Sequence, residues 1–157
     1  MLRSKNLTGV LSQAVQENRQ GSTIISSILV TPNGRLVASF HNSRPPPVPH
    51  AGNGTAGDKQ TAAPYTVDRT MRTKVYGLFA SSTWGEYTKA DAGCEWLSVR
   101  TDDALMVIHN VNLKQSGQNL LLVIVADPST ALGLMQKRAT ETVQVLEEGL
   151  ADFKVYE

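Results

Sequence analysis

Long hydrophobic runs are missing from this chain of 157 residues. The longest, residues 120–126, is far shorter than the roughly 18 apolar residues that a membrane-spanning helix needs. The first residues contain no apolar core of the kind that a signal peptide has. Leu2 also stands where N-myristoylation requires glycine. We therefore expect no direct membrane insertion, and any contact with a membrane must be made through partners.

Cysteine is nearly absent, and neither sign of charge dominates. Cys94 is the single cysteine, which excludes an internal disulfide framework and favours the reducing cytoplasm. The 15 basic and 14 acidic residues give a net charge of +1, so composition provides no argument for a nucleic-acid partner. The length and the 41% of hydrophobic residues fit a single globular domain, which we expect over residues 1–157.

Residue combinations that support catalysis are also missing. The three histidines, His41, His50 and His109, have no partner at the spacing of a metal site. The sequence contains no phosphate-binding P-loop, no dinucleotide-binding glycine motif and no nucleophile-elbow motif. A structural role for the Cys94 thiol is favoured over a nucleophilic one, because no histidine follows it in a recognisable context. We expect no catalytic residue, no metal and no cofactor.

One segment differs in composition from the rest of the chain. Residues 43–66 contain almost no large apolar side chain but many prolines and glycines, namely Pro45, Pro46, Pro47, Pro49, Pro64, Gly52, Gly54 and Gly57. Such a segment buries too little surface to offset its ordering entropy, so we expect a flexible Pro/Gly-rich loop inserted in the domain. A ligand for a proline-binding module is the alternative.

The remaining sequence predicts three helices and five strands. Helical spacing of apolar residues predicts helices over residues 5–18 and 67–89, and a third that starts with Asp127 as N-cap and Pro128 at the first helical position. Strands are predicted over residues 23–31, 35–41, 94–101, 104–111 and 120–126. The turn signal Pro32-Asn33-Gly34 joins the first two strands into a hairpin.

This order of elements predicts an α+β fold with a five-stranded antiparallel sheet and helices on both faces. We expect the first and last helices on one face and the middle helix on the other. Residues 120–126 are apolar on both sides of the strand, as in a central strand. Residues 94–101 alternate, with Leu97 and Val99 on one side and Trp96, Ser98 and Arg100 on the other, and we expect this strand at the sheet edge.

The middle helix has two apolar stripes where a surface helix needs only one. The first contains Met71, Val75, Leu78 and Phe79; the second contains Tyr76, Ala80, Thr83, Trp84 and Tyr87. Burial of both stripes within one domain is one interpretation. The other is that one stripe covers the domain's own sheet while the second contacts another chain.

The edge strand favours the second interpretation. An exposed edge with apolar side chains promotes aggregation unless another chain pairs with it. We therefore predict a dimer in which the edge strand and the second stripe meet a partner. The predicted interface residues are Tyr76, Ala80, Thr83, Trp84, Tyr87, Trp96, Leu97, Val99 and Arg100.

Four segments resemble a known family. They are residues 1–14, 80–87, 119–122 and 143–150, with the sequences MLRSKNLTGVLSQA, ASSTWGEY, NLLL and VQVLEEGL. Together they resemble the roadblock/LC7 family, in particular its subunits in the Ragulator complex and in that complex's fungal counterpart, the EGO complex. The resemblance covers most of the chain outside residues 43–66.

The resemblance implies a profilin-like roadblock/LC7 fold and a non-catalytic scaffold function. The implied partners are a sister roadblock subunit, a lipidated membrane-anchor subunit and Rag-type GTPases, whose docking relays amino-acid status to TORC1. The implied location is the cytoplasmic side of late endosomes, lysosomes or the vacuole, reached through partners. The long insertion at residues 43–66 departs from the family.

Two alternatives keep the same fold. A dynein light chain of the roadblock type would bridge motor and cargo, and only the partner distinguishes it from the scaffold. A regulator of a small GTPase would need an arginine that reaches the nucleotide, for which Arg100 is the candidate. A solvated edge charge is the favoured interpretation of Arg100.

Overall fold

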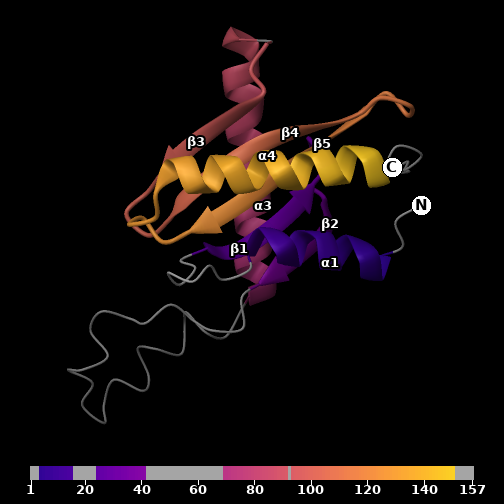
Figure 1. Ribbon diagram of the computed structural model, residues 1–157. Coiled ribbons are helices and arrows are strands. Elements are labelled where there is room, and N and C mark those ends of the chain that lie inside the picture. Colours follow the sequence, from indigo (N-terminus) through magenta and orange to yellow (C-terminus); the bar gives the residue numbers. More distant parts are fainter. Residues whose placement is uncertain (1–3, 16–23, 42–68, 92, 151–157) are drawn as a thin grey trace, which may run out of the picture.

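A computed structural model describes residues 4–15, 24–41, 69–91 and 93–150. The elements follow the predicted order of helix, two strands, helix, three strands and helix (Figure 1). They are α1 (Ser4–Val15), β1 (Ile24–Val30), β2 (Leu36–His41), α3 (Arg69–Ala90), β3 (Trp96–Arg100), β4 (Leu105–Leu113), β5 (Gln118–Ala126) and α4 (Leu132–Gly149). The segment predicted to be a flexible loop, residues 43–66, lies outside the described residues.

The strands form one antiparallel sheet with the order β2-β1-β5-β4-β3. β5 occupies the centre, and its residues from Leu120 to Ala126 are all buried, because helices cover both faces of the sheet there. β3 lies at one edge and pairs only with β4 among the described strands. The predicted sheet, its central strand and its β3 edge are confirmed.

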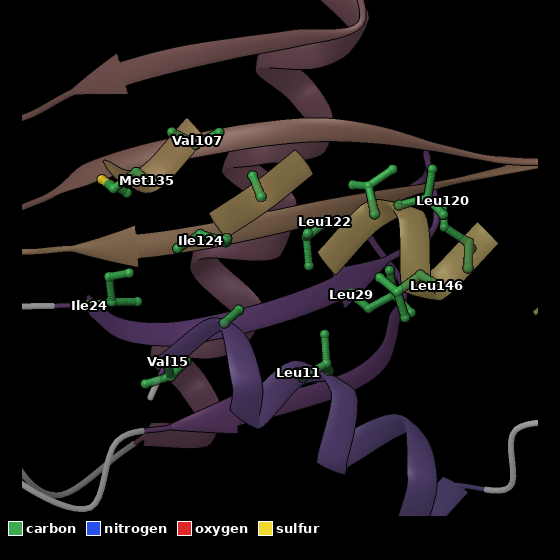
Figure 2. Packing of buried hydrophobic residues seen from close by; sticks show 14 of the residues in the cluster. Leu11, Val15, Ile24, Leu29, Val107, Leu120, Leu122, Ile124, Met135 and Leu146 are labelled. Carbon is green, nitrogen blue, oxygen red and sulfur yellow. The ribbon is translucent and has the colours of Figure 1, made fainter. Parts of the chain in front are cut away.

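The helices lie on the predicted faces of the sheet. α1 and α4 run across one face, and α3 crosses the other (Figure 1). The larger core cluster packs between the sheet and α1 and α4, where Leu11 and Leu146 approach Leu29, Leu120 and Leu122 (Figure 2). A smaller cluster under α3 contains Ile28, Val30, Ala80, Met106, Ile108, Leu121, Val123 and Val125, together with Ala104. Alternation along each strand divides its side chains between these two clusters.

The turn between β1 and β2 forms where the proline, asparagine and glycine predict it. The amide of Gly34 donates to the carbonyl of Thr31 at 2.8 Å, and the amide of Thr31 donates to the carbonyl of Arg35 at 2.9 Å. Gly34 has a φ of 87°, a conformation that a residue with a Cβ adopts only with strain. The predicted hairpin is confirmed.

The start of the last helix was predicted wrongly. α4 begins at Leu132 with Ala131 as its N-cap, not after Asp127. The carboxylate of Asp127 instead accepts hydrogen bonds from the amide and the hydroxyl of Ser129, at 2.8 and 2.7 Å. These bonds hold the pKa of Asp127 below its ordinary value. An Asp side chain that bonds two residues ahead stabilises a separate turn, so the chain completes this turn before α4 begins.

Candidate partner interface

β3 forms an open edge of the sheet. Its register with β4 places Trp96 opposite His109 and Arg100 opposite Leu105. No described strand lies on its other side. The thiol of Cys94 donates to the carbonyl of Trp96 at 3.2 Å, which gives this half-buried cysteine a structural contact. An edge of unpaired backbone groups is a template for a strand of another chain.

The side chains of β3 follow the predicted alternation. Leu97 and Val99 are half-buried and pack against the cluster under α3. Trp96 is also half-buried but packs against the larger cluster on the opposite face. Ser98 and Arg100 are exposed. Three of the four predicted interface residues on β3 are therefore only partly covered within the chain.

α3 has two apolar stripes, as predicted, and the stripe containing Ala80 is the one that packs on the chain's own sheet. Ala80 is 0% exposed, and Tyr76 and Trp84 pack beside it against the chain's own sheet. The prediction that Ala80 lies at a partner surface is therefore corrected, because its small side chain lies where the helix approaches the strands. Thr83 is half-buried, and Tyr87 stays 60% exposed.

Glycine allows α3 to approach the sheet closely. A Cβ on Gly77 would lie 3.0 Å from Cγ1 of Val30 in β1. A Cβ on Gly34 would lie 2.8 Å from Cδ2 of Leu78 on the helix. These contacts orient α3 so that the stripe containing Ala80 faces the strands.

The other stripe of α3, which was not included in the predicted interface, is the more exposed one. Val75 and Leu78 are each 57% exposed and Phe79 is 42% exposed. Leu78 lies beside the turn between β1 and β2, where Cδ2 approaches Gly34. Met71 belongs to the same predicted stripe, but its side chain lies outside the described residues. Large apolar side chains grouped on one exposed helix face indicate a binding surface. The sequence pattern identified both stripes but did not distinguish the inner from the outer one.

A partly buried polar contact links α3 to the hairpin, and the sequence did not predict it. The imidazole of His41 is hydrogen-bonded through Nδ1 to the hydroxyl of Ser26 at 2.7 Å and through Nε2 to the hydroxyl of Thr73 at 2.8 Å. Ser26 and Thr73 are both buried. These residues come from β1, β2 and α3, so no local spacing could have revealed the contact. His41, which had no partner in the sequence pattern, therefore anchors the start of α3.

The described residues contain little that resembles a catalytic or metal site. They bring no group of three or more His, Cys, Asp or Glu side chains together at a distance suitable for a metal ion. His109 uses its Nδ1 in a hydrogen bond with the carbonyl of Asn110 at 2.8 Å. Among the described helices, none combines the length and apolar composition needed to cross a bilayer. What the geometry offers is an edge strand and an exposed helix face.

Comparison with known proteins identifies the fold. No protein-family model matches the sequence, and no curated protein matches it significantly. Solved structures do match. The gliding protein MglB from Thermus thermophilus is 12% identical with a TM-score of 0.65, and the match covers 96% of this chain and 92% of that one. MglB from Myxococcus xanthus is 14% identical with a TM-score of 0.60 and coverage of 97% and 100%.

A third structure carries the fold in its name. The Roadblock/LC7 domain from Streptomyces avermitilis is 12% identical, with a TM-score of 0.59 over 91% of this chain and 96% of that one. Identities this low establish the architecture and leave the activity open. The five-stranded sheet, the helices on both faces and these likenesses together show that the chain has the roadblock/LC7 fold.

Proposed function

We propose that this protein is a non-catalytic scaffold subunit that pairs edge to edge with a sister roadblock subunit. The observation that carries the proposal is the open edge of β3 with its partly covered Leu97 and Val99. A partner strand would satisfy the outward backbone groups of β3 and would cover these side chains.

α3 would enlarge the same interface. Its C-terminal turns continue past the β3 edge (Figure 1) and carry the exposed Tyr87. In a joined sheet this part of the helix would lie over the neighbouring subunit. Tyrosine is common in such positions, because it provides a large contact area at low entropic cost. Strand pairing alone buries little surface, so a stable dimer needs this helical contribution.

The specific setting that we propose is a Ragulator- or EGO-type complex. The sequence of residues 1–14, together with residues 80–87, supports this assignment beyond the fold. In such a complex a lipidated subunit would hold the assembly on late endosomes, lysosomes or the vacuole, and Rag-type GTPases would dock for signalling to TORC1. We assign the exposed stripe of Val75, Leu78 and Phe79 to such a further partner, because large parts of these apolar side chains are exposed.

A regulator of a small GTPase is the second candidate. The exposed side chain of Arg100 at the sheet edge is the observation that favours it. If Arg100 entered a nucleotide site, Arg100→Ala would lower GTPase stimulation by about 10³-fold or more. Unchanged hydrolysis in the presence of this variant would exclude Arg100 from that role.

The test of the scaffold proposal is affinity purification of the tagged chain under mild detergent, with identification of its partners by mass spectrometry. Recovery of another roadblock protein, a lipidated subunit and Rag-type GTPases would support the complex. Recovery of dynein intermediate chain would keep the pairing but assign the protein to cargo transport. Recovery of no roadblock protein would contradict the proposal.

A matched pair of variants tests the surface. Tyr87→Asp adds a charge at an exposed apolar position of α3, and Val145→Asp does so at an exposed position of α4 on the other face of the sheet. Both should fold normally. We expect Tyr87→Asp to reduce recovery of the sister subunit at least tenfold and Val145→Asp to leave it unchanged. Equal recovery with both variants would show that the end of α3 lies outside the interface.

A further inference from the structure

β4 extends further than β3, so the sheet has a second, short open edge. At the start of β3 the two strands are still paired, and the amide of Asn110 donates to the carbonyl of Glu95 at 2.9 Å. β4 continues to Leu113, where it pairs with β5. Residues 111–113 therefore have a described strand on one side only. This edge lies beside the β4–β5 hairpin (Figure 1).

The outward amide of this edge is bound by a side chain instead of a strand. Backbone groups along an antiparallel strand face its two neighbours in alternation. Since Asn110 faces β3, Asn112 faces the same side, where β3 no longer continues. Its amide donates to Oε1 of Glu147 in α4 at 3.0 Å. The carboxylate thus takes the position that the carbonyl of an added strand would have.

A cleft lies next to this contact, between the β4–β5 hairpin and the last turns of α4. Its volume is about 470 Å³. The described residues that line it are all polar or charged, namely Asn112, Lys114, Gln115, Gln144, Glu147 and Glu148. Glu147 is half-buried and the others are exposed. Ligand pockets for small molecules are mostly apolar, so this lining suits the backbone and polar side chains of an extended polypeptide better.

The charge of the cleft favours a cation. Glu147 and Glu148 lie in the last turn of α4, which contains no basic residue. The C-terminal end of a helix already carries a partial negative charge, so carboxylates there are unfavourable unless a cation is near. Lys114 is the single basic residue in the described lining, and neither glutamate forms an ion pair within the described part of the chain.

A polypeptide strand with a basic side chain would satisfy both the edge and the charge. Its carbonyl would accept from the amide of Asn112 in place of Glu147. The released carboxylate would then pair with the arginine or lysine of the same strand, in a charge-assisted hydrogen bond. The exchange keeps the hydrogen bond at the edge and adds an ion pair.

We propose that this edge and cleft together bind an extended segment of a partner protein that carries a basic residue. The segment pairs its backbone with Asn112, and its arginine or lysine side chain lies beside Glu147 and Glu148. The site uses none of the outward backbone groups of β3. The proposal therefore goes beyond the pairing with a sister subunit and does not depend on it.

Two short capped peptides test the proposal on the full chain labelled with nitrogen-15. One alternates threonine with arginine, and the other alternates threonine with glutamine. Backbone amide shifts in NMR spectra report where each peptide binds and how tightly. We expect the arginine peptide to shift the amides of Asn112 and Lys114 and to bind about threefold to fivefold more tightly than the glutamine peptide, the effect of an exposed ion pair.

Glu147→Gln and Glu141→Gln form a matched pair of variants on α4. The first removes a charge from the cleft but keeps an oxygen that can accept from the amide of Asn112. The second removes an exposed charge outside the cleft. Glu147→Gln should weaken binding of the arginine peptide about threefold to fivefold, and Glu141→Gln should leave it unchanged.

Four results would overturn the inference. Equal affinity for the two peptides would show that the cleft does not select a basic residue, and equal effects of the two substitutions would place binding elsewhere. Spermidine that binds as tightly as the arginine peptide would indicate a site for any organic cation. If Lys154→Gln shifts the amide of Asn112 without peptide, the cleft already holds residues 151–157 of this chain. Recovery of a roadblock protein would be unaffected by any of these results, so the proposed function is tested separately.

Discussion

Both the backbone conformation and the close packing against α3 favour glycine at position 34. Its φ of 87° is strained for other residues, and an added Cβ would lie 2.8 Å from Leu78. Gly117 has a similar φ of 68°, but no atom in the described part of the chain lies within 4 Å of an added Cβ. The two glycines therefore separate the effect of backbone conformation from the effect of close packing.

Alanine substitutions at these two positions give a direct prediction. Gly117→Ala should lower the free energy of unfolding by about 1 kcal/mol, the effect of a positive φ alone. Gly34→Ala should lower it by about 1 kcal/mol more, because Leu78 must also move. Urea denaturation measures both. Equal losses of unfolding free energy for the two variants would mean that Leu78 and α3 shift at little cost to accommodate the added methyl group.

Ser26 and Ser27 are neighbours on β1 with opposite roles. The hydroxyl of Ser26 is hydrogen-bonded to the ring of His41, whereas the buried hydroxyl of Ser27 has no hydrogen-bond partner among the described residues. Ser26→Ala should lower the free energy of unfolding by about 1 kcal/mol, since the ring of the half-buried His41 loses a hydrogen-bond partner. Ser27→Ala should be neutral or slightly stabilising, because no hydrogen bond is lost. A larger loss at Ser27 than at Ser26 in thermal or urea unfolding would contradict this assignment.

Among the elements, α3 has the most asymmetric environment. Trp84 on its inner side packs against the cluster under the helix, and Phe79 on its outer side contacts solvent. Glycine at positions 34 and 77 brings the inner side close to the strands. The outer side keeps large apolar groups that add little to the stability of the isolated chain.

Truncation of the two aromatic residues should therefore have unequal effects. Trp84→Ala should lower the free energy of unfolding by about 2 kcal/mol or more, through lost burial and a new cavity. Phe79→Ala should change it by less than about 0.5 kcal/mol, as exposed substitutions do. Calorimetry on both variants checks the difference. A stability loss at Phe79 as large as that at Trp84 would mean that the outer side is packed within the same chain.

For the molecule as a whole, the hydrogen bond between His41 and Thr73 brings together the end of β2 and the start of α3. These residues are 32 positions apart in the sequence. The Pro/Gly-rich segment at residues 43–66 lies between them. Its predicted role as an inserted loop remains a prediction.

Shortening residues 43–66 tests whether this segment is an inserted loop. Replacing residues 43–66 with about six Gly and Ser residues shortens the connection between β2 and α3 roughly threefold, which should raise the free energy of unfolding by about 1 kcal/mol. Denaturant unfolding and recovery of the sister subunit would be measured together. A clear loss of stability would show that the segment packs as part of the fold. Loss of recovery alone would assign it a partner contact.

Much of this architecture follows from local sequence patterns. The alternation of Leu97 and Val99 predicted a strand exposed at one edge, and the continuous apolar run of β5 predicted the centre of the sheet. The hairpin followed from the turn residues that end at Gly34. The start of α4 was missed because Asp127 and Pro128 fit a helix start and a turn equally well, and the bonds from Ser129 decided between them.

The sequence by itself determined the order of elements, the two-sided sheet and the presence of two apolar stripes on α3, because periodicity is a local property of the chain. Only the tertiary structure decided which stripe is buried. That choice depends on the approach of Gly77 to Val30 and of Gly34 to Leu78, and on the contact of Thr73 with His41. Each of these contacts joins residues far apart in the sequence. The candidate partner surface thus consists of what this packing leaves uncovered.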